Sequence, residues 1–178
     1  GHGDNICPAL EGGLLLIQGI DPIKTVSLPV PDCQMVVVCP DVVVKTRDAR
    51  AVLPTSWPLE DYVRQSAHLA GVIAALYRED VSLLRDNMQD ILIAPHRTAA
   101  VPGFDGVQAA ALEAGALACS LSGSGPTVFA MAERGEQAVL IEKEMVRAFS
   151  DAGVSAVSWV SSISTQGAMV MEDSACAT

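Results

Sequence analysis

Residues 118–132 read Ala-Cys-Ser-Leu-Ser-Gly-Ser-Gly-Pro-Thr-Val-Phe-Ala-Met-Ala, two apolar runs separated by a loop of serine and glycine. Short apolar runs bounded by Gly, Ser and Pro are typical of buried strands that a turn connects. We therefore predict strands over 118–121 and 127–132. After them, an apolar stripe at helical spacing from Ala138 to Phe149 predicts a helix that Gly153 ends, and 154–163 predicts a further strand.

Helical patterns dominate the chain before this hairpin. After Pro58, apolar residues recur at helical spacing from Leu59 to Tyr77, and shorter stripes predict helices over 81–91 and 105–115. Nearer the N-terminus, three apolar runs bounded by Pro and Gly predict strands: 14–17, 25–28 and 35–39. From 35–39 onward, the order is strand, three helices, two strands, helix and strand. This order is that of an α+β sandwich, and we predict a ferredoxin-like domain over about residues 32–163.

Composition excludes several classes of protein. Of the 178 residues, 50% are hydrophobic and 18% are charged, and the net charge is -10, so nucleic acid is not an expected partner. No apolar run approaches the roughly 18 residues that span a bilayer, and the N-terminus has no pattern of a secretory signal, so we expect a cytoplasmic protein. Five cysteines without C-x-x-C spacing indicate reduced thiols, and the three scattered histidines indicate no metal site. His68, within an apolar stripe, is expected to be a structural histidine with satisfied hydrogen bonds.

Three polar segments carry the candidate chemistry. The loop Ser122 to Thr127 is either a hairpin turn that needs positive φ at glycine or a concavity of backbone N–H groups that binds an anion. His2, Asp4 and Asn5 are either an exposed terminal cluster or the lining of a small polar site. Arg50 and Arg97 lie in two similar segments, Ala49 to Pro54 and Pro95 to Phe104, and are either surface residues or two forks for a planar carboxylate.

Taken in order along the chain, these motifs resemble the homoserine kinase family of the GHMP superfamily of small-molecule kinases. The resemblance runs from Gly1 to about Met171 and is carried by the following segments: His2-Gly3-Asp4-Asn5 with Pro8 and Gly12-Gly13, Ala49-Arg50 with Leu53-Pro54, His68 to Gly71, Asp90 to Pro95 with Arg97, Val101 to Phe104, and Ser122 to Thr127. The last segment marks the superfamily. The first segment and the two arginine segments point to homoserine.

The resemblance implies how the chain divides into domains and which half of the enzyme binds ATP. Residues 1–31 would be a remnant of an N-terminal domain, 32–163 the GHMP kinase C-terminal domain, and 164–178 a segment that returns to the N-terminal domain and ends in a frayed tail. The Gly-Leu-Gly-Ser-Ser loop that cradles nucleotide phosphates in this superfamily has no match here. ATP and Mg²⁺ would therefore be bound mainly by a missing N-terminal half, so Gly1 would lie within a longer polypeptide and this chain would be inactive alone.

The same resemblance assigns residues to the substrate. Arg50 and Arg97 would grip the carboxylate of L-homoserine, Asp4 would face its ammonium group and Asn5 its hydroxyl group, with His2 and Thr46 in the same pocket. Gly123, Ser124 and Gly125 would close the site on the nucleotide side, and no general base is assigned because phosphoryl transfer needs mainly alignment and charge neutralisation. One departure is Ala94, where the family usually has a glutamate before the proline.

Two other functions stay open from the sequence. Another GHMP kinase would share the Ser122 to Thr127 loop and lack the two carboxylate-binding arginines. A free-standing ferredoxin-like module that binds an amino acid without catalysis would lack a nucleotide loop, as this chain does. The sequence does not indicate an oligomeric state, and a homodimer is compatible with it.

Overall fold

The fold is taken from a computed structural model that describes residues 3–170, except for the side chain of Ile20. Two compact units make up the chain. One comprises Pro31–Ser162, and the other is formed by the stretch through Val30 together with the stretch from Ile163 onward. Each unit is described separately below.

A four-stranded antiparallel sheet organises the larger unit. Its strands are β3 (Cys33–Pro40), β4 (Ala118–Leu121), β5 (Val128–Glu133) and β6 (Ala156–Ser162), in the spatial order β4-β5-β3-β6. The first strand of the domain therefore lies between the last two, which is the ferredoxin-like arrangement. The predicted fold class is confirmed, and all four predicted strands are present within one or two residues of their expected bounds.

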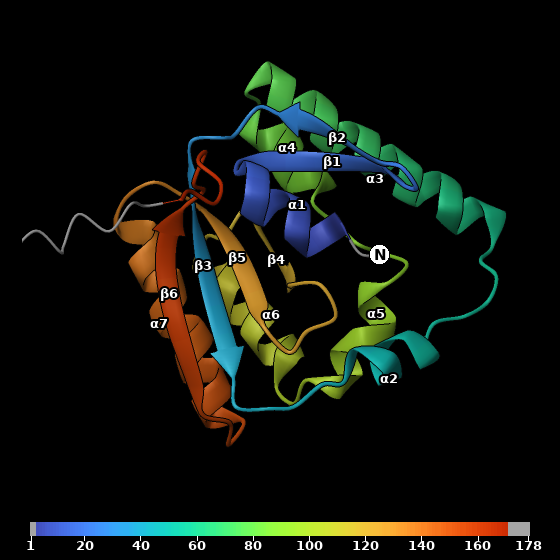
Figure 1. The fold of residues 1–178 in the computed structure, drawn as a ribbon. Helices are drawn as coiled ribbons and strands as arrows, with labels where there is room; N and C mark the ends of the chain where they lie inside the picture. The colour runs from blue at the N-terminus through green and yellow to red at the C-terminus, as the bar shows by residue number, and fades with distance from the viewer. Residues whose placement is uncertain (1–2, 171–178) are drawn as a thin grey trace, which may run out of the picture. The chain divides into compact units, whose positions relative to one another are not determined.

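The core lies between this sheet and two helices, α6 (Phe104–Glu113) and α7 (Glu136–Asp151), which cover the same face in Figure 1. Alternation along the strands decides which side chains face the helices, because successive residues of a strand point to opposite faces. Val36 and Val38 of β3 are fully buried against the helices. On α7, the predicted stripe is the buried face, and its residues Ala138, Ile141, Met145 and Phe149 all have 0% exposure.

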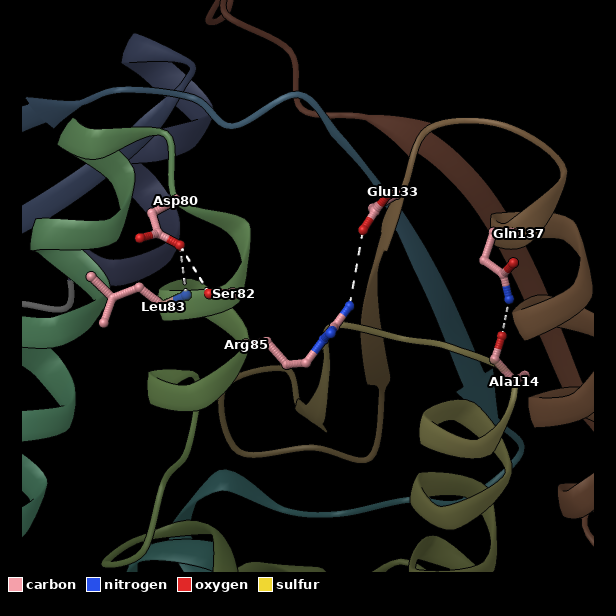
Figure 2. Close-up of polar contacts among 7 residues, drawn as sticks. All are labelled: Asp80, Ser82, Leu83, Arg85, Ala114, Glu133 and Gln137. Carbon is pink, nitrogen blue, oxygen red and sulfur yellow. Dashed lines mark hydrogen bonds and ion pairs between the residues drawn. The ribbon is translucent and has the colours of Figure 1, made fainter.

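Two further helices, α3 (Leu59–Arg78) and α4 (Val81–Asn87), pack against each other. Asp80 caps α4, since its Oδ1 accepts a hydrogen bond of 2.9 Å from the Leu83 amide (Figure 2). The expected helix over 81–91 ends early, at Asn87. From there the chain turns toward α3, where Gln65 pairs with the backbone, accepting from the Ile91 amide at 2.8 Å and donating to the Gln89 carbonyl at 3.2 Å.

The prediction for His68 was wrong. This residue lies on α3 and is half-buried, but its Nδ1 atom is buried and has no hydrogen-bond partner in the described part of the chain. The helical period places His68 on the stripe, but it does not record whether a hydrogen-bond partner lies within reach of its ring.

Three short helical segments were not expected from the sequence: α2 (Thr46–Ala51), α5 (Ala94–Arg97) and the 3₁₀ turn η1 (Thr98–Ala100). Pro95 was expected to limit the helix before it, and α4 does end before this residue, at Asn87. Pro95 itself stands in the first turn of α5, where a missing N–H costs nothing and a fixed φ fits the helix.

The smaller unit contains α1 (Gly3–Glu11) and a hairpin of β1 (Leu14–Ile20) and β2 (Ile23–Leu28). The two strands agree with the sequence patterns at 14–17 and 25–28, but α1 was not expected. Backbone hydrogen bonds join the last turn of α1 and the residues after it to the segment after β6: the Ala168 amide donates to the Ala9 carbonyl at 2.9 Å, and the Gly13 amide donates to the Ser164 carbonyl at 2.7 Å. Among residues 3–170, no helix is long and apolar enough to cross a membrane.

Candidate functional site

Arg97 joins three segments of the larger unit that are far apart in sequence. From α5, its Nε donates a hydrogen bond of 3.3 Å to the Ala49 carbonyl in α2, and its Nη1 donates one of 3.1 Å to the Gly123 carbonyl in the loop between β4 and β5. Both acceptors are backbone oxygens, so the positive charge of Arg97 is not neutralised by them. Its Nη2 group donates to no residue within 3–170, which leaves donors for a further acceptor.

Helix α2 carries two of the predicted substrate residues. Thr46 begins the helix and Arg50 lies in its last turn, four residues later, so their side chains share one face. Both residues are exposed, whereas Ala49 between them is buried. Because Arg97 binds the carbonyl of Ala49, the structure brings the Arg50 and Arg97 segments together, as the carboxylate hypothesis requires.

A carboxylate on one side and an aromatic pair on the other hold α5 in place. Asp90 accepts three backbone hydrogen bonds, from the amides of Leu92 (3.1 Å), Ile93 (2.7 Å) and Ala94 (3.0 Å), so it fixes the chain that enters the helix. On the other side, the rings of Trp57 and His96 meet edge to face with centroids 5.2 Å apart. The sequence reasoning quoted Asp90 to Pro95 for the resemblance but assigned no positioning role to Asp90, Trp57 or His96.

The loop between β4 and β5 is a closed turn. The Ser122 amide donates to the Thr127 carbonyl at 2.8 Å, and the Gly125 amide donates to the Ser122 carbonyl at 3.0 Å. Gly123 and Gly125 have φ of 61° and 78°, values that a side chain disfavours, so the loop requires both glycines. In the described part of the chain, the amides of Gly123 and Ser124 donate to no acceptor, so the turn also presents two free N–H groups. Both alternatives for this loop therefore have support in the geometry.

The remaining predicted residues belong to the smaller unit. Asp4 and Asn5 lie in the first turn of α1 and are exposed, and the acidic side chain suits the positive end of the helix dipole. His2 lies outside the described residues.

A cavity of about 700 Å³ lies elsewhere in the larger unit, between the chain after α4 and the outer side of β4 and α6. Its lining includes Arg85, Asp90, Gln108 and Cys119, and none of the predicted substrate residues. Arg85 reaches from α4 to Glu133 at the end of β5, at 3.9 Å (Figure 2). Burial raises the pKa of the Cys119 thiol to about 12, so this cysteine is not a nucleophile at neutral pH.

The chain is similar to a known protein family and to a solved structure. Residues 72–151 match the family described as GHMP kinases C terminal. A solved homoserine kinase from Cytophaga hutchinsonii superposes with a TM-score of 0.91 at 40% identity, over 94% of this chain and 53% of that one.

The curated proteins that this chain resembles are homoserine kinases. The homoserine kinase of Chlorobaculum tepidum is 38% identical over 173 residues, which are 96% of this chain and 53% of the relative. That of Xylella fastidiosa is 38% identical over 170 residues, which are 96% of this chain and 52% of the relative. The chain is thus similar to homoserine kinases along almost its whole length, and it spans about half the length of the curated relatives it matches.

Proposed function

We propose that this chain is the C-terminal half of a homoserine kinase, an enzyme that transfers the terminal phosphoryl group of ATP to the side-chain hydroxyl of L-homoserine and forms O-phospho-L-homoserine, a step of threonine biosynthesis. The observation that carries the proposal is identity of 38 to 40% to homoserine kinases over 94 to 96% of the chain. A cytoplasmic location, where free amino acids and ATP are available, belongs to the same proposal.

The two arginines would recognise the amino-acid part of the substrate. A carboxylate accepts two parallel N–H bonds from a guanidinium group, and Arg97 keeps donors available after its two backbone bonds. Arg50 lies one residue from the carbonyl that Arg97 binds, and Thr46 is one helical turn away. We assign the carboxylate to Arg50 and Arg97 and a hydroxyl contact to Thr46.

The other assignments rest on the resemblance. Asp4 carries the negative charge that an ammonium group requires, Asn5 can bond a hydroxyl group, and His2 is assigned with them. Gly123, Ser124 and Gly125 would face the nucleotide, where the free amides of Gly123 and Ser124 could donate to phosphate oxygens. No residue of this chain is assigned as a general base, because positioning and charge neutralisation supply most of the catalysis in phosphoryl transfer.

The described residues do not fit a magnesium site of their own. Within 3–170, no three His, Cys, Asp or Glu side chains gather closely enough to hold a metal ion. We therefore propose that the other half of the enzyme supplies most of the ATP and metal contacts. The 178-residue chain alone should then show no sustained phosphorylation of homoserine.

The proposal is tested with the full-length product of the gene that encodes this chain. With ATP and Mg²⁺ it should convert homoserine to O-phosphohomoserine, detected by mass spectrometry. Phosphorylation of a different alcohol in preference to homoserine would favour another GHMP kinase. Binding of an amino acid without any phosphorylation would favour a non-catalytic module.

Substrate variants test the arginine assignment. Arg50→Ala and Arg97→Ala should each remove about 2 to 5 kcal/mol of interaction with a carboxylate in a partly dry pocket, which is roughly 30-fold to several-thousand-fold in kcat/KM for homoserine. Each should change kcat/KM for 3-aminopropan-1-ol, which lacks the carboxylate, much less. Arg47→Ala is the matched control, since Arg47 lies on the same helix with its side chain 94% exposed. Equal losses on both substrates would overturn the carboxylate assignment.

A further inference from the structure

The cavity of about 700 Å³ between the chain after α4 and the outer side of β4 and α6 lies within the larger unit. Small-molecule sites usually have volumes of about 300 to 1,000 Å³ and a mostly apolar lining with a few polar groups. The apolar wall of this cavity is formed by Met88, Ile91, Leu112 and residues 116–118, and none of the predicted substrate residues lines it. The cavity therefore has the size and the wall of a second ligand site.

Of the two charged residues in the described lining, one is available to a ligand. The Asp90 carboxylate already accepts three backbone amides of the chain that enters α5, so three of its roughly four acceptor positions are occupied. Arg85 pairs with Glu133 only at 3.9 Å, which is too long for a hydrogen bond, and both side chains are more than half exposed (Figure 2). The charge that the cavity offers to a ligand is therefore positive.

A backbone N–H group of β4 is also without a partner on this side. Hydrogen-bonded pairs alternate along an antiparallel ladder, and the Ser122 amide donates to the Thr127 carbonyl at 2.8 Å. Cys119, three residues earlier, therefore stands at a non-hydrogen-bonded position opposite Ala130, and its backbone groups point away from β5. Gln108 donates to the Cys119 carbonyl at 2.8 Å, whereas within 3–170 no residue accepts from the Cys119 amide. Cys119 lines the cavity and is only 5% exposed, and a buried backbone donor without a partner is rare in native proteins.

We propose that this cavity binds an organic monocarboxylate whose apolar body carries a hydrogen-bond acceptor. The planar guanidinium group of Arg85 would donate two parallel hydrogen bonds to the carboxylate. The body would lie against Met88 and Leu112, where the flexible thioether of Met88 adapts to its shape. The acceptor atom of the body would take the hydrogen bond of the Cys119 amide. One molecule would then satisfy the free charge, the apolar wall and the unpaired backbone donor together.

Charge disfavours other kinds of ligand in this cavity. A phosphate monoester or a dicarboxylate would place a second negative charge beside Glu133, in a chain whose net charge is -10. An amino acid would bring an ammonium group, for which Asp90 has little acceptor capacity left. The expected ligand therefore differs from homoserine, and this inference does not depend on the proposed kinase activity.

The ligand would also touch the segment that carries Arg97. Asp90 and Ala94 line the cavity, the Ala94 amide donates to Asp90 at 3.0 Å, and Ala94 begins α5. A molecule packed against this segment opposes its local opening, so the amides of Leu92, Ile93 and Ala94 should exchange more slowly when the cavity is filled. Occupancy of the cavity would in this way hold Arg97 more firmly.

A titration of the 178-residue chain followed by amide NMR tests the binding. The probes are three phenyl ketones, 3-benzoylpropionate, 4-benzoylbutyrate and 5-benzoylvalerate, in which two, three or four methylene groups separate the ketone from the carboxylate. At least one should bind with a Kd of a few millimolar or tighter, shift the Cys119 amide and slow the exchange of the Leu92 amide. The primary amide of that acid, which lacks the charge, should bind at least about tenfold more weakly. No saturable binding up to about 20 mM, equal binding of acid and amide, or shifts centred on Arg50 and Arg97 instead of Cys119 would overturn the proposal.

Two pairs of variants locate the site. Arg85→Ala should raise the Kd of the bound acid roughly 10- to 100-fold, because hydrogen bonds to a charged group are lost. Arg64→Ala is the matched control and should leave the Kd unchanged, since Arg64 does not line the cavity and its side chain is 59% exposed, against 54% for Arg85. Leu112→Glu should abolish binding by placing a negative charge in the wall, whereas Leu140→Glu should not, although the two leucines are 47% and 46% exposed, because Leu140 does not line the cavity. Equal effects within either pair would overturn the site.

Discussion

Removing Arg97 should loosen the larger unit whether or not substrate is present, because this side chain ties α5 to α2 and to the β4–β5 loop. Arg97→Ala deletes hydrogen bonds of 3.3 and 3.1 Å from a charged donor to two backbone carbonyls. Such bonds contribute about 1.5 to 3 kcal/mol each when buried, and Arg97 is only half-buried, so we expect about 1 to 3 kcal/mol for the pair. The thermal midpoint of this unit should fall by roughly 3 to 10 °C.

Two control variants make this prediction specific. Arg85→Ala removes an arginine whose 3.9 Å ion pair with Glu133 is formed by side chains 54% and 64% exposed, so it should cost less than about 0.5 kcal/mol. Arg97→Lys should fall between Arg97→Ala and the unmodified chain, because an ammonium group cannot reproduce the fork that spans both carbonyls.

The assay combines thermal unfolding with hydrogen exchange. In Arg97→Ala, the amides of Ser122 and Gly125, whose bonds close the loop, should exchange faster than before, and those of β3 should change only through the global stability. If Arg97→Ala and Arg85→Ala unfolded at the same temperature, or if the loop amides were unaffected, the positioning role of Arg97 would have to be abandoned.

Four further outcomes follow from the structure. Phe149→Ala, at a fully buried position, should cost about 3 to 5 kcal/mol of unfolding free energy by denaturant titration, whereas Leu140→Ala on the same helix, 46% exposed, should cost much less. The hydrogen bond from the Leu83 amide, aided by Ser82, lowers the pKa of Asp80. The stabilising effect of the ionised Asp80 cap should therefore be present above about pH 4 and lost as the pH falls through the lowered pKa. Asp80→Ala should unfold more easily than the unmodified chain at pH 7 and not at low pH, while Asp80→Asn keeps the cap without titrating. Burial raises the pKa of Cys119 to about 12. The stabilising effect of burying this thiol in its neutral form should be complete below about pH 8.5 and lost as the pH rises toward 12. Iodoacetamide at pH 8 should therefore modify Cys119 only in denaturant. Amides of the β1–β2 hairpin should exchange faster than those of α3 in the monomeric chain, and equal protection would contradict the view that this hairpin lacks the neighbours of a complete domain.

Local patterns in the sequence were sufficient to predict the helices and strands that pack against the core. The stripe from Ala138 to Phe149 could be interpreted without tertiary information, because a helix that faces a core repeats its apolar residues at its own period. The continuous apolar run from Met35 to Cys39 predicted a strand in the same way, but only the structure showed which of its side chains face the helices. The glycines at 123 and 125 belong to the same group, since their need for positive φ is a property of the local backbone. Both glycines lie in the Ser122 to Thr127 segment, which is one of the segments that carried the resemblance to a kinase family.

Only the tertiary structure decided the remaining features. Helices α2 and α5 have six and four residues, too few to be stable alone, and they exist because Ala49 is buried and Arg97 and Asp90 bind backbone groups around them. Helix α1, with Pro8 inside it, is joined through its end to the segment after β6. The order of strands that leaves β6 open has the same origin: pairing between segments more than a hundred residues apart depends on how the whole sheet is covered, and no local period in the sequence records it.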